Sequence, residues 1–69
     1  MWLEIVLEGY TKEHRTMILN LFQKLKEVNI LCVDCDSDNC PISIELICSI
    51  PVFNIIKGLA NADCLTYYD

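Results

Sequence analysis

The chain has 69 residues, of which 54% are hydrophobic, with only two glycines and two prolines, so the composition excludes a disordered linker and predicts one folded domain over residues 1–69. At this length only about 60% of the unfolded surface is buried on folding, so a partner or a second copy would add stability. The net charge is −5, and basic residues concentrate between residues 12 and 26, which leaves an anionic remainder that repels nucleic acid backbones.

In the N-terminal segment Leu3, Ile5 and Leu7 should face one side and Glu4, Val6 and Glu8 the other, which predicts a half-buried strand. Gly9 and Tyr10 lead out of this strand. Thr11 is a fair N-cap for a helix that we expect to continue to about Val28. One face of this helix should carry the apolar stripe His14, Ile18, Leu21, Phe22, Leu25 and Val28. The polar face should include Lys12, Arg15, Gln23, Lys24 and Glu27, with Leu19 as an isolated apolar residue among them.

The second half of the chain begins with a short β-branched strand at residues 30–33, which an acidic turn, residues 34–39, should end. A clear alternation follows from Ile42 to Ile50 and predicts a strand whose core face is Ile42, Ile44, Leu46, Cys48 and Ile50. Pro51 suits the first turn of a second helix. The stripe of that helix should be Val52, Ile55, Ile56 and Leu59, and residues 64–68 should form a last strand.

The order β-α-β-β-α-β is that of the ferredoxin-like α+β sandwich, in which a four-stranded antiparallel sheet carries both helices on one face. In that arrangement the first and third strands are central. Their outward residues should line the uncovered face of the sheet: Glu4, Val6, Glu8, Ser43, Glu45 and Ile47. RNA-binding domains of this architecture place basic and aromatic residues there, so carboxylates at these positions disfavour RNA recognition.

The acidic turn also has the spacing of a calcium loop, because Asp34, Asp36, Asp38 and Glu45 occupy its first, third, fifth and twelfth places. Three departures argue against calcium. Asn39 replaces the usual glycine, Pro41 follows closely, and strands rather than helices flank the segment. The favoured interpretation is a hairpin connection kept soluble by its charges, and we predict no metal site.

The five cysteines, Cys32, Cys35, Cys40, Cys48 and Cys64, are an odd set, and three of them fall in or beside extended, apolar stretches, which predicts reduced thiols. The spacing of Cys32 and Cys35 permits a zinc or redox motif. However, no second cysteine pair at matching spacing accompanies it, and no helix follows directly. His14 is the sole histidine, and no nucleophile elbow or phosphate loop is present. We therefore expect neither an enzyme nor a bound cofactor.

The sequence thus favours a small acidic interaction module that binds a basic surface of a protein partner, as an inhibitor or regulator of the kind that viruses and plasmids encode. No apolar run spans a bilayer and no signal peptide is apparent, so we expect a cytoplasmic protein that can also self-associate through the exposed sheet or its last strand. A small-ligand or metal sensor and a structural subunit remain alternatives. The expected interface consists of Glu4, Val6, Glu8, Asp34, Asp36, Asp38, Glu45, Ile47, Tyr67 and Tyr68.

Overall fold

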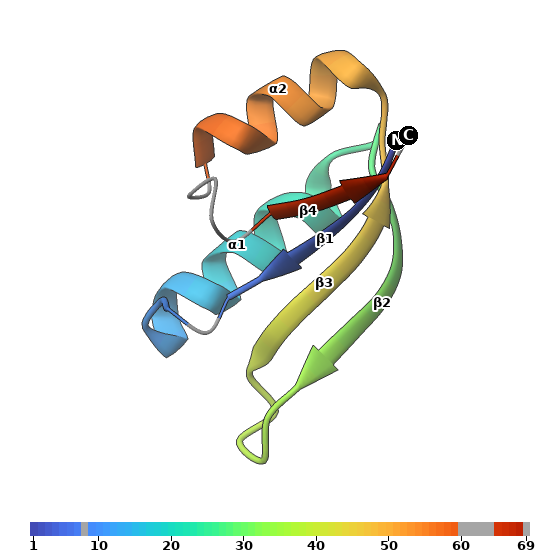
Figure 1. Ribbon diagram of the computed structural model, residues 1–69. Helices are drawn as coiled ribbons and strands as arrows, with labels where there is room; N and C mark the ends of the chain where they lie inside the picture. The colour runs from blue at the N-terminus through green and yellow to red at the C-terminus, as the bar shows by residue number, and fades with distance from the viewer. Residues whose placement is uncertain (8, 60–64, 69) are drawn as a thin grey trace.

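The computed structural model describes residues 1–7, 9–59 and 65–68, and for residues 59 and 65–68 it describes the backbone alone. Up to residue 59 the described chain is α+β, with a three-stranded antiparallel sheet and two helices in the order β-α-β-β-α (Figure 1). The elements are β1 (Trp2–Val6), α1 (Lys12–Lys24), β2 (Asn29–Cys35), β3 (Pro41–Ile47) and α2 (Ile50–Leu59). None of the described helices is long and apolar enough to cross a membrane.

The sheet has the order β1-β3-β2, so that β3 lies between two antiparallel neighbours. A short strand, β4 (Leu65–Tyr68), pairs antiparallel with the other edge of β1 and gives the full order β2-β3-β1-β4. The strands β1 and β3 are therefore interior, as predicted from the sequence. The β2–β3 pairing is interrupted twice, between Ile30 and Cys32 and between Asp34 and Cys35, and such bulges bend an edge strand.

Helix α1 begins where predicted, because the Thr11 hydroxyl accepts a hydrogen bond from the His14 amide at 3.2 Å. It ends four residues earlier than predicted. Leu25 adopts an extended conformation, and its amide donates to the Phe22 carbonyl oxygen at 3.2 Å. A turn then brings the Val28 amide to the Leu25 carbonyl oxygen. Both Leu25 and Val28 pack against the core from this turn, so their apolar spacing reflects burial outside a helix.

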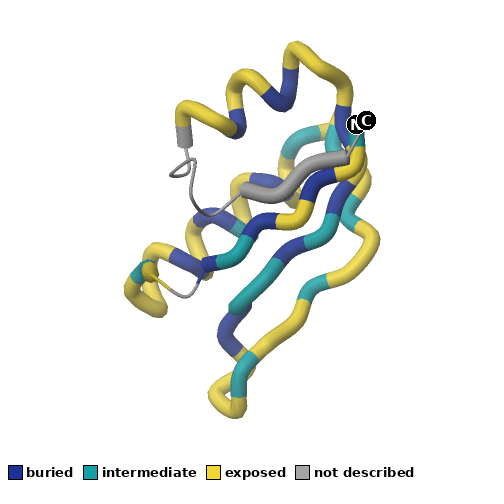
Figure 2. The backbone as a smooth tube through the Cα atoms, in the orientation of Figure 1, coloured by how far each residue is buried: buried dark blue, intermediate teal, exposed yellow. Residues whose placement is uncertain are grey.

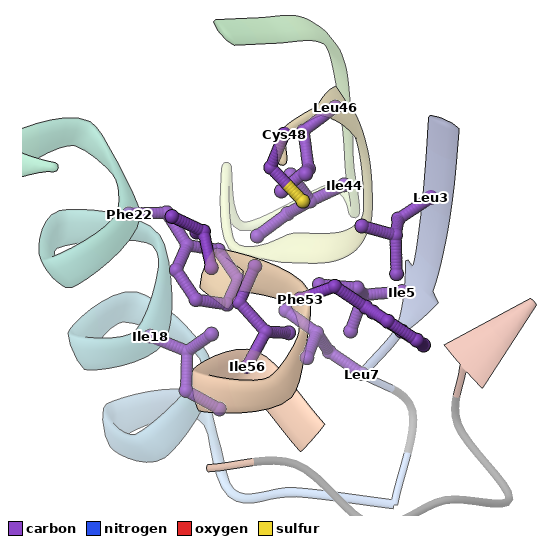
Figure 3. Packing of buried hydrophobic residues seen from close by; sticks show 11 residues of the cluster. Leu3, Ile5, Leu7, Ile18, Phe22, Ile44, Leu46, Cys48, Phe53 and Ile56 are labelled. Atoms are coloured by element: carbon purple, nitrogen blue, oxygen red, sulfur yellow. The ribbon is translucent and has the colours of Figure 1, made fainter. Parts of the chain in front are cut away.

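The core lies between one face of the sheet and the two helices (Figure 3). Its strand residues are Leu3, Ile5, Ile44 and Leu46, and Leu7 and Cys48 directly follow β1 and β3; all six were predicted for this face. Its helical residues are Ile18, Phe22, Val52, Phe53 and Ile56. Leu3 is paired with Leu46, and Ile5 with Ile44, so the two interior strands present matched apolar rows. Because residues of both helices join the same cluster as these rows, both helices cover the same face of the sheet (Figure 1).

The predicted helical stripes were partly wrong. His14 and Ile55 are exposed, although each was assigned to a stripe, whereas Arg15 and Phe53 are buried. Burial along the chain is shown in Figure 2. Arg15 can lie on the inner side because the hairpin between β2 and β3 supplies acceptors for its guanidinium. Helix α2 is oriented so that the adjacent residues Val52 and Phe53 both lie in the core, and Ile55 therefore faces outward.

Strand boundaries also differ from the prediction. β2 continues to Cys35, so Asp34 and Cys35 belong to the strand and not to the expected turn. β1 ends at Val6, which is earlier than expected, because the strand was predicted to continue until Gly9 and Tyr10 lead out of it. β3 ends at Ile47, because the Ser49 carbonyl oxygen already accepts the helical hydrogen bond of Phe53 at 2.9 Å. Ile50 is therefore the first residue of α2, where it is exposed, and not a core residue of the strand.

Candidate functional site

The sheet face opposite the helices is formed by the outward residues of the two interior strands. These residues form three cross-strand pairs, and we call them the open face: Trp2 with Ile47, Glu4 with Glu45, and Val6 with Ser43. Residues directly opposite on antiparallel strands share a face and are close enough for their side chains to interact. The open face therefore consists of an apolar pair, an acidic pair and a mixed pair arranged along the strands.

The acidic pair places two carboxylates of the same sign side by side. Glu4 is exposed and Glu45 is half-buried. The ion pairs within the described residues join Lys12 to Asp38 and Arg15 to Asp36, so neither glutamate is neutralised by a basic side chain there. Like charges directly opposite each other destabilise a sheet, where an opposite pair would contribute about 0.2–1 kcal/mol. The open face thus carries an uncompensated negative charge at its centre.

The apolar pair lies at the end of the sheet where β1 begins and β3 ends. Trp2 is 45% exposed and Ile47 is 44% exposed, although both are large hydrophobic residues in interior strands. Aromatic residues on accessible surfaces are typical contact residues of protein interfaces. The exposed apolar pair beside the acidic pair therefore combines the two kinds of side chain that an interface with a basic protein uses.

The edge strand β2 extends this surface on one side. Cys32 lies opposite Glu45, and Asp34 lies opposite Ser43. The Ser43 hydroxyl donates to the Asp34 carboxylate at 3.1 Å, and both Cys32 and Asp34 are exposed. Asp34 thus adds a third carboxylate next to the open face.

Two further acidic residues of the predicted interface, Asp36 and Asp38, form contacts within the molecule. One carboxylate oxygen of Asp36 accepts from the amides of Asp38 at 2.9 Å and Cys40 at 3.0 Å, and its second oxygen lies 3.7 Å from Arg15 Nη1. Asp38 forms an ion pair with Lys12 of α1. The interface role predicted for Asp36 and Asp38 stays a prediction; in the structure both carboxylates contact basic side chains of α1, so the turn docks on that helix.

This docking affects the ionisation of Asp36. The amide hydrogen bond from Cys40 is the main reason why the pKa of Asp36 lies below its ordinary value of 3.8. Partial desolvation opposes the lowering, whereas the Asp38 amide and the charges of Arg15 and Lys12 add to it. Asp36 is thus held as a carboxylate that organises the turn, in which Asn39 adopts a left-handed φ of 65°.

The four carboxylates of the calcium spacing are dispersed among three environments. Asp34 binds Ser43, Asp36 and Asp38 bind the turn and α1, and Glu45 is on the sheet. Within residues 1–7, 9–59 and 65–68, no three His, Cys, Asp or Glu side chains are grouped so that they could hold a metal ion. The four described cysteines are unpaired thiols. Cys32 and Cys35 are exposed, and Cys40 and Cys48 are buried.

Three members of the predicted interface lie outside the described parts of the chain: Glu8, and the side chains of Tyr67 and Tyr68. The backbone of β4 pairs Tyr67 with Leu3 and Tyr68 with Trp2. Sequence reasoning missed Trp2 as a surface residue. Its position was readable, because Trp2, Glu4 and Val6 have the same parity in one strand and therefore point to the same side.

No protein-family model, curated protein or solved structure matches this chain.

Proposed function

We propose that this protein is a non-enzymatic interaction module that binds a basic surface of a protein partner through its open face. One observation carries the proposal. Glu4 and Glu45 are direct cross-strand neighbours without a basic partner among the described residues, beside the exposed pair Trp2 and Ile47. A cationic group of a partner would remove the repulsion between the two carboxylates, while Trp2 and Ile47 would bury apolar surface.

The two kinds of contact have different roles in the proposed complex. Charge complementarity accelerates encounter and selects the partner, and the apolar contacts slow dissociation. A lysine or arginine between Glu4 and Glu45 would bind both carboxylates, and arginine would do so with several donors at once. The acidic character of the face also disfavours nucleic acid as its ligand.

We infer in addition that the whole chain adopts the ferredoxin-like arrangement. The interior position of β1 and β3, the common side of the two helices and the pairing of β4 with β1 support this inference. The architecture hosts many unrelated activities. The proposed function therefore depends on the residues of the open face and not on the fold.

The proposal is tested with synthetic peptides rich in arginine and lysine and containing leucine. Trp2 is the sole tryptophan of the chain, so its fluorescence reports directly on the open face. We expect titration with the basic peptide to shift the Trp2 emission and, in NMR spectra, the amide signals of Glu4, Val6, Glu45 and Ile47. A peptide with glutamate in place of the basic residues should leave both unchanged.

The matched variants are Glu4→Gln with Glu45→Gln, and Glu27→Gln as a control. Glu27 is exposed in the turn after α1, where it borders a hollow together with Val52 and Ile55 of α2. The double variant should bind the basic peptide at least about tenfold more weakly, since it loses two charged contacts, and Glu27→Gln should bind like the natural chain. Equal affinity of all three proteins, or amide shifts confined to other surfaces, would refute the proposal.

A further inference from the structure

The outward side of α1 has a pattern that complements itself. Glu13, Met17, Asn20 and Lys24 follow one another at spacings of four, three and four residues, so they form a single stripe along the helix. The buried residues of α1 are Arg15, Ile18 and Phe22, so the stripe lies on the side opposite the core. Its ends carry opposite charges, and its middle includes Met17, which is 58% exposed.

Met17 also forms a ridge together with Leu21, one turn further along the helix and 39% exposed. A hollow lies on each side of this ridge. The larger, of about 720 Å³, is bounded by α1 and the turn residues Asp38, Asn39 and Cys40. The smaller, of about 230 Å³, lies on the side of His14 and Ile18. Helices pack by inserting the ridges of one into the grooves of the other, so this surface has both elements that a helix partner requires.

We propose that α1 binds a second copy of this chain through its outward stripe. The two α1 helices are antiparallel and related by a twofold axis that crosses the stripe midway along it, at the level of residues 18 and 19. In that arrangement Glu13 of each copy meets Lys24 of the other, and Met17 meets Asn20. The contact is self-complementary, as a twofold interface must be. A parallel arrangement would instead place Glu13 beside Glu13 and Lys24 beside Lys24.

The charges favour a second copy on α1 over a second copy on the open face. Two open faces in contact would bring four glutamates together, two from each molecule. On α1, neither Glu13 nor Lys24 has an ion-pair partner among the described residues, so both are available. We therefore assign self-association to α1, whereas the sequence analysis expected it at the exposed sheet or its last strand. A dimer through α1 leaves the open face accessible to a basic partner.

The test begins with sedimentation velocity over a range of protein concentrations. The natural chain should show a reversible monomer–dimer equilibrium, and Glu13→Lys and Lys24→Glu should each dimerise about tenfold more weakly, because two attractive pairs become repulsive. An equimolar mixture of the two variants should recover the dimer. In the mixed dimer, one helix carries two lysines at these positions and the other two glutamates, so both pairs are again complementary.

Two further variants separate this proposal from general effects and from the open face. Met17→Lys should abolish the dimer, whereas Ile55→Lys, at an equally exposed apolar position of α2 (60% exposed), should preserve it. Glu4→Gln with Glu45→Gln should also preserve it, so failure of the α1 contact and failure of the open face are distinguishable. Circular dichroism verifies that each variant is folded.

Three outcomes would overturn the α1 dimer. The first is a natural chain that remains monomeric at about 1 mM, which corresponds to a binding free energy weaker than about −4 kcal/mol. The second is a mixture of Glu13→Lys and Lys24→Glu that dimerises no better than either variant alone. The third is a dimer that Met17→Lys leaves intact.

Discussion

Arg15 of α1 and Pro41 of β3 are joined by a buried hydrogen bond, in which Arg15 Nη1 donates to the Pro41 carbonyl oxygen at 3.4 Å. The same guanidinium lies 3.7 Å from the Asp36 carboxylate. Its Nε atom is buried and has no hydrogen-bond partner within the described structure. This side chain therefore links the helix to the hairpin and also carries an unsatisfied donor, so its net contribution to stability is the balance of two opposing effects.

Replacing Arg15 should reveal that balance. We expect Arg15→Ala to lower the free energy of unfolding by about 1–3 kcal/mol, because it leaves the Pro41 carbonyl and Asp36 without their partner. Arg15→Met should cost less than Arg15→Ala, because it retains the packed aliphatic stem and removes the unsatisfied donor. Urea unfolding measures both values. The substitution Lys26→Ala, at an exposed position in the turn after α1, is the control, and a loss for Arg15→Met as large as for Arg15→Ala would contradict this account.

The lowered pKa of Asp36 predicts a loss of stability in acid. A carboxyl group whose pKa in the folded state lies below its unfolded value contributes stability above that value, here 3.8, and the contribution disappears as the pH falls through the folded pKa. The thermal midpoint should therefore decrease as the pH is lowered below 3.8. Asp36→Asn should weaken this decrease, since its amide oxygen still accepts from Cys40 and Asp38 but does not titrate. Ser37→Ala, in the same turn, should retain it.

The turn itself offers a second local test at Asn39. Its φ of 65° is in the left-handed region, which asparagine tolerates and glycine adopts without cost. We expect Asn39→Gly to preserve or slightly raise stability, and Asn39→Val to lower it by about 1–2 kcal/mol. Urea unfolding of the two variants distinguishes backbone strain from a side-chain role. Equal losses in both would show that the asparagine side chain matters more than its backbone conformation.

The core residues of the strands were predicted more accurately than those of the helices. Alternation has a period of two residues, so Leu3, Ile5, Ile44 and Leu46 could be assigned to the core without knowledge of their partners. A helical stripe is wider and less sharply defined. The inward position of Arg15 depends on acceptors in a hairpin more than twenty residues away, at Asp36 and Pro41, and no local pattern contains that information.

In the candidate site, too, local patterns predicted the direction of side chains, whereas long-range contacts determined which residues meet. The outward direction of Glu4, Glu45 and Ile47 followed from the strand pattern, but the pairing of Glu4 with Glu45 depends on the register between β1 and β3. Register is a long-range property that the turn and the core determine together. The ion pair of Asp38 likewise depends on Lys12, which lies in a different element.

Which side of α2 faces the sheet can be tested with two adjacent isoleucines. Ile56 is fully buried, whereas Ile55 is 60% exposed. Ile56→Ala should lower the free energy of unfolding by about 2–5 kcal/mol, because it leaves a cavity in the core, and Ile55→Ala should change it by no more than about 0.5 kcal/mol. Chemical denaturation measures the difference. Similar losses at the two positions would mean that α2 packs with a different side toward the sheet.

Removing the repulsion between Glu4 and Glu45 should stabilise the folded chain and at the same time weaken its binding to a basic partner. Glu45→Lys would place opposite charges at a cross-strand position that now holds two carboxylates, so we expect the free energy of unfolding to rise by about 0.2–1 kcal/mol. The same change should abolish binding of the basic peptide. Glu27→Lys alters the net charge by the same amount away from the sheet and is the matched control for both measurements.

Because the repulsion is between partly solvated charges, the stabilisation should shrink as salt is added. If Glu45→Lys stabilises the chain no more than Glu27→Lys does at low salt, the two glutamates do not repel each other measurably. The repulsion would then contribute nothing to partner binding.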